Sequence, residues 1–128
     1  EKDNQLPELP GGSGWLLIGD FDESQKKYIR GPFYKIVKSN YIDKTPFPRK
    51  GEIIRITTDR NVIIAGYKKE GTTRIFQPPW QENILQEEDY TGLKVKSGSL
   101  VEVRDISMGH FHGMPFVVWV RIAEPTNY

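Results

Sequence analysis

Short runs of β-branched and aromatic residues, each ended by a turn signal, constrain the fold of this chain more than any other feature. The clearest runs are residues 52–58 and 61–67. Glycine, proline, asparagine and aspartate interrupt such runs at spacings of roughly 8 to 12 residues. Helical composition appears only at residues 81–89, where one short helix or an acidic loop would fit. We therefore expect an all-β domain, either a small barrel or a sandwich.

The other runs extend this pattern along the chain. Residues 15–37 predict an N-terminal β-hairpin, in which Pro32 should lie at a strand start, a bulge or an edge because it has no N–H to donate to a sheet. Residues 40–51 predict a loop. Residues 116–122 are so apolar that this strand should be central and covered on both faces. Further strands are expected at 28–37, 72–76, 94–96 and 100–106.

Size and charge exclude several classes of protein. The 128 residues match one domain, and 18 Lys and Arg against 17 Asp and Glu leave a net charge of +1, too small to steer polyanions. Aromatic and basic residues are interleaved at 28–30, 34–35 and 67–69, as in single-strand nucleic-acid binders, but the weak charge argues against a nucleic-acid partner. No apolar run approaches the roughly 20 residues of a membrane-spanning helix, so no membrane span is expected.

The first residues and the cysteine count add two expectations. Residues 1–14 contain two prolines and a Gly-Gly-Ser-Gly run, which predicts a flexible leader of the kind that joins a module to a membrane anchor or another domain. One folded domain is then expected over residues 15–128. The chain has no cysteine, which excludes disulfides, thiolate metal ligands and cysteine nucleophiles.

The second half of the chain carries a resemblance to a known family. Residues 93–105 contain a glycine-bearing turn followed by a Val-x-Val strand, residues 118–122 form a tryptophan-bearing last strand, and residues 58–66 look like an opening signature. Over about residues 48–123 the chain resembles a bacterial SH3-like (SH3b) domain, a small β-barrel often appended to cell-wall and envelope proteins. The resemblance implies an SH3-like barrel with the N-terminal hairpin as an addition, and a location in the bacterial envelope or outside the cell.

Aromatic residues around a proline-broken stretch are the candidates for ligand binding. Exposed loop aromatics are costly, so these side chains either pack on the domain as a lid or line a groove for a peptide or glycan. A basic residue among them and two histidines in a glycine-flanked loop could add polar contacts. The predicted ligand-binding residues are Tyr67, Arg74, Phe76, Trp80, Tyr90, His110 and His112.

Patterns for metal binding and catalysis are weak. His110-x-His112 supplies two imidazoles on one face of a strand, but the chain has no third histidine, so a polar loop tip or a ligand-contacting loop is the alternative. Residues 20–24 begin like a calcium loop, yet Gln25 stands where that loop needs glycine. The acidic residues of 82–89 could form a catalytic pair, although such runs are typically solvated faces. We expect no catalysis, no metal and no cofactor.

These observations together predict a non-catalytic binding or assembly module that recognises a peptide, a peptidoglycan fragment or a protein partner through its aromatic loops. The alternatives are a hydrolase that uses clustered carboxylates or a His-bound metal, and a purely structural spacer. Trp119 is expected in the core, and Trp15 should anchor the first strand. Edge strands of small barrels are frequent dimer seams, which leaves a weak dimer open.

Overall fold

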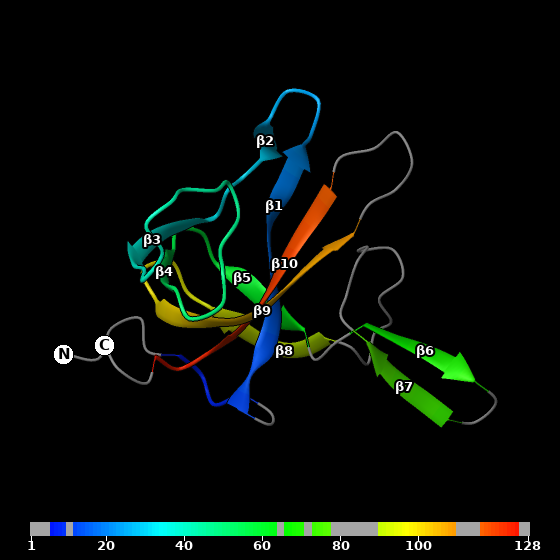
Figure 1. The fold of residues 1–128 in the computed structure, drawn as a ribbon. Coiled ribbons are helices and arrows are strands. Elements are labelled where there is room, and N and C mark those ends of the chain that lie inside the picture. The colour runs from blue at the N-terminus through cyan, green and yellow to red at the C-terminus, as the bar shows by residue number, and fades with distance from the viewer. Residues whose placement is uncertain are drawn as a thin grey trace.

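The computed structural model describes residues 6–9, 12–63, 66–70, 73–77, 90–109 and 116–125, which form strands, turns and loops (Figure 1). Eight strands make one antiparallel sheet in the order β3-β4-β9-β10-β1-β5-β8, with β2 paired to β1 off this path, and β6 and β7 form a separate pair. The strands are β1 Gly14–Asp22, β2 Lys27–Arg30, β3 Tyr34–Lys38, β4 Ile53–Ile56, β5 Arg60–Ile63, β6 Gly66–Glu70, β7 Thr73–Gln77, β8 Tyr90–Val95, β9 Leu100–Gly109 and β10 Phe116–Ala123.

The all-β class is therefore confirmed. The predicted loop at 40–51 lies between β3 and β4, and the predicted strands at 52–58, 72–76 and 100–106 correspond to β4, β7 and β9. The acidic stretch 81–89 lies outside the described residues. Within the described part of the chain, no helix is long and apolar enough to span a membrane.

One face of the main sheet surrounds the larger core. Apart from Leu9, which precedes β1, its side chains come from β1, β3, β4, β5, β8, β9 and β10, so the sheet curls around them. Burying a large aliphatic or aromatic side chain contributes roughly 1.5–3 kcal/mol, which makes this core the main source of stability. The core residues are Leu9, Leu16, Ile18, Phe21, Tyr34, Ile54, Ile56, Val62, Val95, Val101, Val103, Val118, Val120 and Ile122.

The opposite face of β1 and β10 carries a smaller apolar cluster. It consists of Trp15, Leu17, Ile63 and Trp119, all nearly inaccessible to solvent. β10 lies between β9 and β1 and contributes Val118 to the larger core and Trp119 to the smaller one. The predictions for the last strand and for the two tryptophans are therefore confirmed.

A β-bulge in β1 shifts the alternation of its side chains. Leu17 pairs with Trp119 and Gly19 with Val118, so Ile18 is an extra residue on this strand. Beyond the bulge the phase changes by one, and Phe21 joins the same core as Ile18.

The connection from β2 to β3 holds the chain close to β1. Pro32 lies between these strands and belongs to neither, whereas a strand start, a bulge or an edge was expected. Gly31 has φ +83°, and a Cβ there would lie 2.7 Å from the Ile18 carbonyl oxygen, so only glycine fits without a shift of backbone. Phe33 N–H donates to Ile18 O at 2.9 Å, and Phe33 O accepts from Thr57 N–H at 3.0 Å. Phe33 thus ties β1 to the chain that follows β4.

Two expectations about the arrangement need refinement. The N-terminal hairpin was expected as an addition to the domain, but its first strand, β1, lies inside the sheet between β10 and β5. The side chains on both faces of β1 are apolar and buried, which suits this central position. Of the two hairpin strands, β2 alone lies off the path of the sheet. Leu9, from the expected leader, is buried in the larger core, and Leu6 packs against it. The ladder of paired strands ends at β3 and β8 and does not close.

Candidate binding site

The connection between β3 and β4, residues 39–52, is the best candidate for a functional site; we name it the Glu52 loop. Among the described residues, large hydrophobic side chains are exposed at six positions, and four of them fall between residues 36 and 42. An exposed apolar patch of this kind marks an interaction site more often than scattered single residues do. The six are Ile29, Ile36, Val37, Tyr41, Ile42 and Met108.

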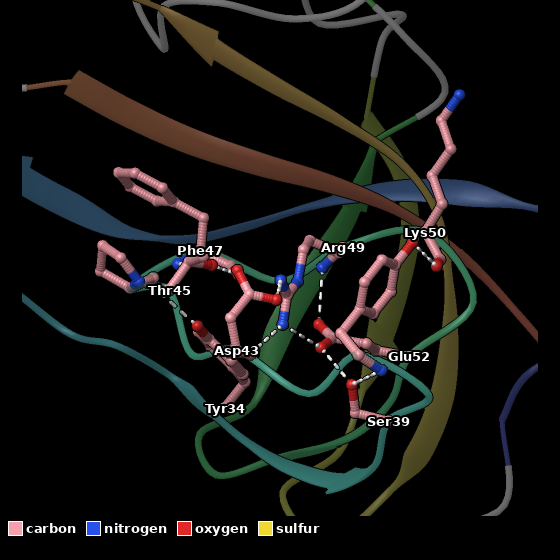
Figure 2. A network of polar contacts seen from close by, with 10 residues as sticks. Tyr34, Ser39, Asp43, Thr45, Phe47, Arg49, Lys50 and Glu52 are labelled. Atoms are coloured by element: carbon pink, nitrogen blue, oxygen red, sulfur yellow. Dashed lines mark hydrogen bonds and ion pairs between the residues drawn. The ribbon is translucent and has the colours of Figure 1, made fainter.

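A buried carboxylate organises the loop. Glu52 is only 1% exposed, and its carboxylate accepts hydrogen bonds from Ser39 Oγ at 2.7 Å and from Arg49 N–H at 2.6 Å. Arg49 Nη2 lies 3.4 Å from the same carboxylate. Figure 2 shows Glu52 between these partners. Burial of an ionised carboxylate requires such partners, so Glu52 holds the two ends of the loop together.

Arg49 extends the network to the outer part of the loop. Its guanidinium donates to Asp43 Oδ1 at 2.9 Å and to Asp43 O at 2.8 Å, and it lies 4.1 Å from the centre of the Tyr41 ring (Figure 2 shows the Asp43 contacts). The hydrogen bond from Arg49 holds the pKa of the Asp43 carboxyl below its ordinary value. Both carboxylates of the loop are therefore engaged by one arginine.

The middle of the loop is fixed to the sheet by two tyrosines. Tyr28 and Tyr34 each donate a hydrogen bond to the Pro46 carbonyl, at 2.6 Å and 3.1 Å. Burial raises the pKa of both phenols, so they remain donors across the ordinary pH range. The Phe47 ring packs edge-on against Phe21 with ring centres 4.8 Å apart. The loop is thus anchored at its ends and at its middle.

A pocket of about 410 Å³ lies against this loop, within the size range of ligand sites. Its lining combines the apolar Ile36, Tyr41 and Ile42 with polar groups of the loop. Ile42 is fully exposed although the loop around it is fixed, which is an unusual position for isoleucine in a free monomer. We call this site the loop pocket; its lining residues are Ile36, Ser39, Tyr41, Ile42, Asp43, Lys44, Thr45, Arg49 and Glu52.

Four of the ligand-binding residues predicted from the sequence, Tyr67, Arg74, Phe76 and Tyr90, lie on β6, β7 and β8, outside the Glu52 loop. Tyr67 on β6 is the direct cross-strand partner of Phe76 on β7, and Arg74 pairs with Lys69 in the same hairpin. Tyr90 starts β8 opposite Ile63. In Figure 1 the β6–β7 hairpin lies on the opposite side of the molecule from β3 and β4. Trp80, His110 and His112 lie outside the described residues.

Residues 20–24, which begin like a calcium loop in the sequence, run from the end of β1 into the turn that leads to β2. Asp22 accepts hydrogen bonds from Ser24 N–H at 3.0 Å and from Ser24 Oγ at 2.8 Å. These bonds lower the pKa of Asp22. Within the described ranges, no group of three or more His, Asp or Glu side chains is placed to hold a metal ion.

The sequence predicts a loop at residues 40–51 but assigns it no role, and it places Glu52 in the strand that follows. One signal was available: Tyr41 and Ile42 are adjacent large hydrophobic residues inside a stretch marked by Asp43, prolines and Gly51. Large hydrophobic residues in a loop either pack against the protein or are exposed to solvent. Here the Tyr41 ring packs against the Arg49 guanidinium, and Ile42 is exposed.

Comparison with known proteins adds no relative: no protein-family model, no curated protein and no solved structure matches this chain.

Proposed function

We propose that this chain is a non-catalytic binding module that takes an apolar side chain of a polypeptide partner at the loop pocket. The observation that carries the proposal is the full exposure of Ile42 on a loop whose conformation is fixed by the buried Glu52 network. A preformed site loses little conformational entropy on binding, so a small apolar contact can yield useful affinity.

The polar groups of the pocket support binding rather than catalysis. Asp43 and Glu52 are both paired with Arg49, and Glu52 also accepts from Ser39 and from a backbone N–H. The hydrogen bond from Arg49 keeps the pKa of Asp43 low, so this carboxylate stays ionised near neutral pH. Carboxylates whose oxygens are engaged by fixed hydrogen-bond partners are poor proton carriers but good structural supports.

The likeness to SH3-like domains belongs to the same proposal. We propose that the curled sheet is a small SH3-like barrel, and that the module works in the bacterial envelope or outside the cell. The two hydrogen bonds of Phe33, one to β1 and one to the chain after β4, support a barrel because they bring together strands from separate parts of the ladder.

A displayed library of random peptides, selected on the purified protein, tests the binding proposal. Enriched peptides should share an apolar residue, and their affinity should fall about tenfold or more for Ile42→Ser, as for a central contact residue. Met108→Ser is the matched control, because Met108 is also exposed but lies on β9. A selection that enriches no sequence, or peptides that bind Ile42→Ser as tightly as the original protein, would overturn the proposal.

A further inference from the structure

A second depression, which we call the strand groove, lies beside the loop pocket. Its volume is about 440 Å³, and its lining residues come from Phe21 of β1, from the chain between Lys26 and Ile36, and from Pro46 of the Glu52 loop. Ile36 lines both the strand groove and the loop pocket. The two depressions therefore meet at this residue, and we treat them together as one elongated site.

The floor of the strand groove is aromatic and rigid. Phe21 and Tyr28 line it, with ring centres 5.2 Å apart in an edge-on arrangement. Tyr34 also lines it, and the hydrogen bonds of Tyr28 and Tyr34 to Pro46 O fix both rings. Such a floor keeps its shape without a ligand, so the groove is preformed like the loop pocket.

The charged side chains along the strand groove are all positive. Lys26, Lys27 and Lys35 line it and are exposed, and its lining contains no acidic residue. Lys27 is partly balanced by Asp22, which lies opposite it on β1. In the adjoining loop pocket, by contrast, both carboxylates are already paired with Arg49. The elongated site thus presents unbalanced positive charge on a protein whose net charge is only +1.

The backbone of Lys26 supports a role for its side chain. Lys26 has φ 56°, in the left-handed region that glycine adopts at much lower cost. A turn that needed only this backbone shape would be more stable with glycine. The lysine therefore occupies a position at which it lowers stability, a pattern that is common at functional sites.

We infer that the partner of this module is an acidic, extended polypeptide segment, whose apolar residue enters the loop pocket while flanking carboxylates meet Lys26, Lys27 and Lys35 in the strand groove. This inference rests on the proposed function, because it assumes that the loop pocket holds a polypeptide. A second copy of this chain is the less suitable occupant. In a two-fold dimer the same surface meets itself, which would bring these lysines against one another.

Titration of two synthetic peptides tests the inference: one carries a single leucine flanked on both sides by glutamates, and its twin has glutamine in place of every glutamate. The glutamate peptide should bind several-fold more tightly than its twin, and added salt should remove most of the difference. Lys27→Gln/Lys35→Gln should weaken binding of the glutamate peptide about fivefold. Lys94→Gln/Lys96→Gln, two exposed lysines on and just after β8, is the charge-matched control and should leave binding unchanged.

The variant Lys26→Gly separates a binding role from a structural one. It should raise the thermal midpoint, since glycine relieves the left-handed backbone, and should weaken binding of the glutamate peptide. Loss of stability in Lys26→Gly, or unchanged binding, would contradict the role assigned to this lysine.

Failure of this inference is distinguishable from failure of the proposed function. Equal binding of the two peptides, with both lost in Ile42→Ser, would overturn the acidic partner and leave the binding module intact. Absence of binding by either peptide would overturn the inference, and the library selection would then judge the proposed function on its own. A concentration-dependent dimer that Ile42→Ser abolishes would also overturn it, in favour of a second copy.

Discussion

The sheet and the Glu52 loop are both ordered, but by opposite means. In the sheet, side chains such as Ile54 and Val103 are excluded from solvent, and order follows from apolar burial. In the loop, the buried group is a carboxylate, Glu52, and order follows from its hydrogen bonds to Ser39 and Arg49. The comparison teaches that a loop ordered by a buried polar centre can leave Ile42 facing outward, where it can meet a partner.

The largest expected effect concerns the sheet. Trp119→Ala removes a side chain that is 1% exposed and leaves a cavity in the smaller apolar cluster of β1, β5 and β10, so the free energy of unfolding should fall by about 3–5 kcal/mol. Equilibrium unfolding in guanidinium chloride measures this loss. Met108→Ala, on an exposed part of β9, should change it by less than about 0.5 kcal/mol. Similar losses in both variants would show that the apolar core does not dominate stability.

The next effect concerns the centre of the loop. Glu52→Gln keeps the shape of the side chain but removes its charge, which leaves the ion pair with Arg49 broken at a buried site. We expect a loss of about 1–3 kcal/mol, measured by the same unfolding experiment. Glu23→Gln, an exposed residue of the β1–β2 turn, should cost almost nothing. A variant as stable as the original protein would show that the carboxylate does not hold the loop.

Two glycines with nearly the same φ allow the sheet and the Glu52 loop to be compared by the same substitution. Gly31 in the sheet connection and Gly51 in the loop have φ of +83° and +88°. A Cβ at Gly51 meets nothing within 4 Å, so Gly51→Ala should cost only the left-handed backbone penalty, about 1–2 kcal/mol. Gly31→Ala should cost at least ~1 kcal/mol more, because its Cβ would lie 2.7 Å from the Ile18 carbonyl oxygen. Equal losses from the two variants would contradict the tight approach at Gly31.

The smallest expected effect is a dependence of loop order on pH. The folded pKa of Asp43 lies below its ordinary value of 3.8, because Arg49 donates a hydrogen bond to the ionised form. The contact therefore stabilises the loop fully above the ordinary value and is lost as the pH falls through the lower folded value. The NMR signals of the Tyr41 ring should move in this acidic range, while methyl signals of Val103 stay fixed. Asp43→Asn should abolish that movement; an unchanged titration in this variant would point to another group.

Apolar patterning predicted most of the sheet and little of the site. The runs at 52–58 and 116–122 show their strands in the sequence because β-branched and aromatic residues gather where a strand is buried. The sequence did not predict the bulge at Ile18 or the break between β2 and β3, because both depend on contacts with other strands. Glu52 and Arg49 have the composition of any polar loop, and only the fold brings Ser39 within 2.7 Å of the buried carboxylate.

Amide hydrogen exchange in the Glu52 loop tests most directly whether the loop is preformed. The Arg49 N–H donates to Glu52 Oε1, and the Gly51 N–H donates to Val103 O at 2.8 Å, so both amides should exchange far more slowly than unstructured ones. In Glu52→Gln, protection of Arg49 should fall while that of amides in β9 and β10 remains. Rapid exchange at Arg49 and Gly51 in the original protein would contradict the account, because a loop that opens freely could not hold Ile42 in place for a partner.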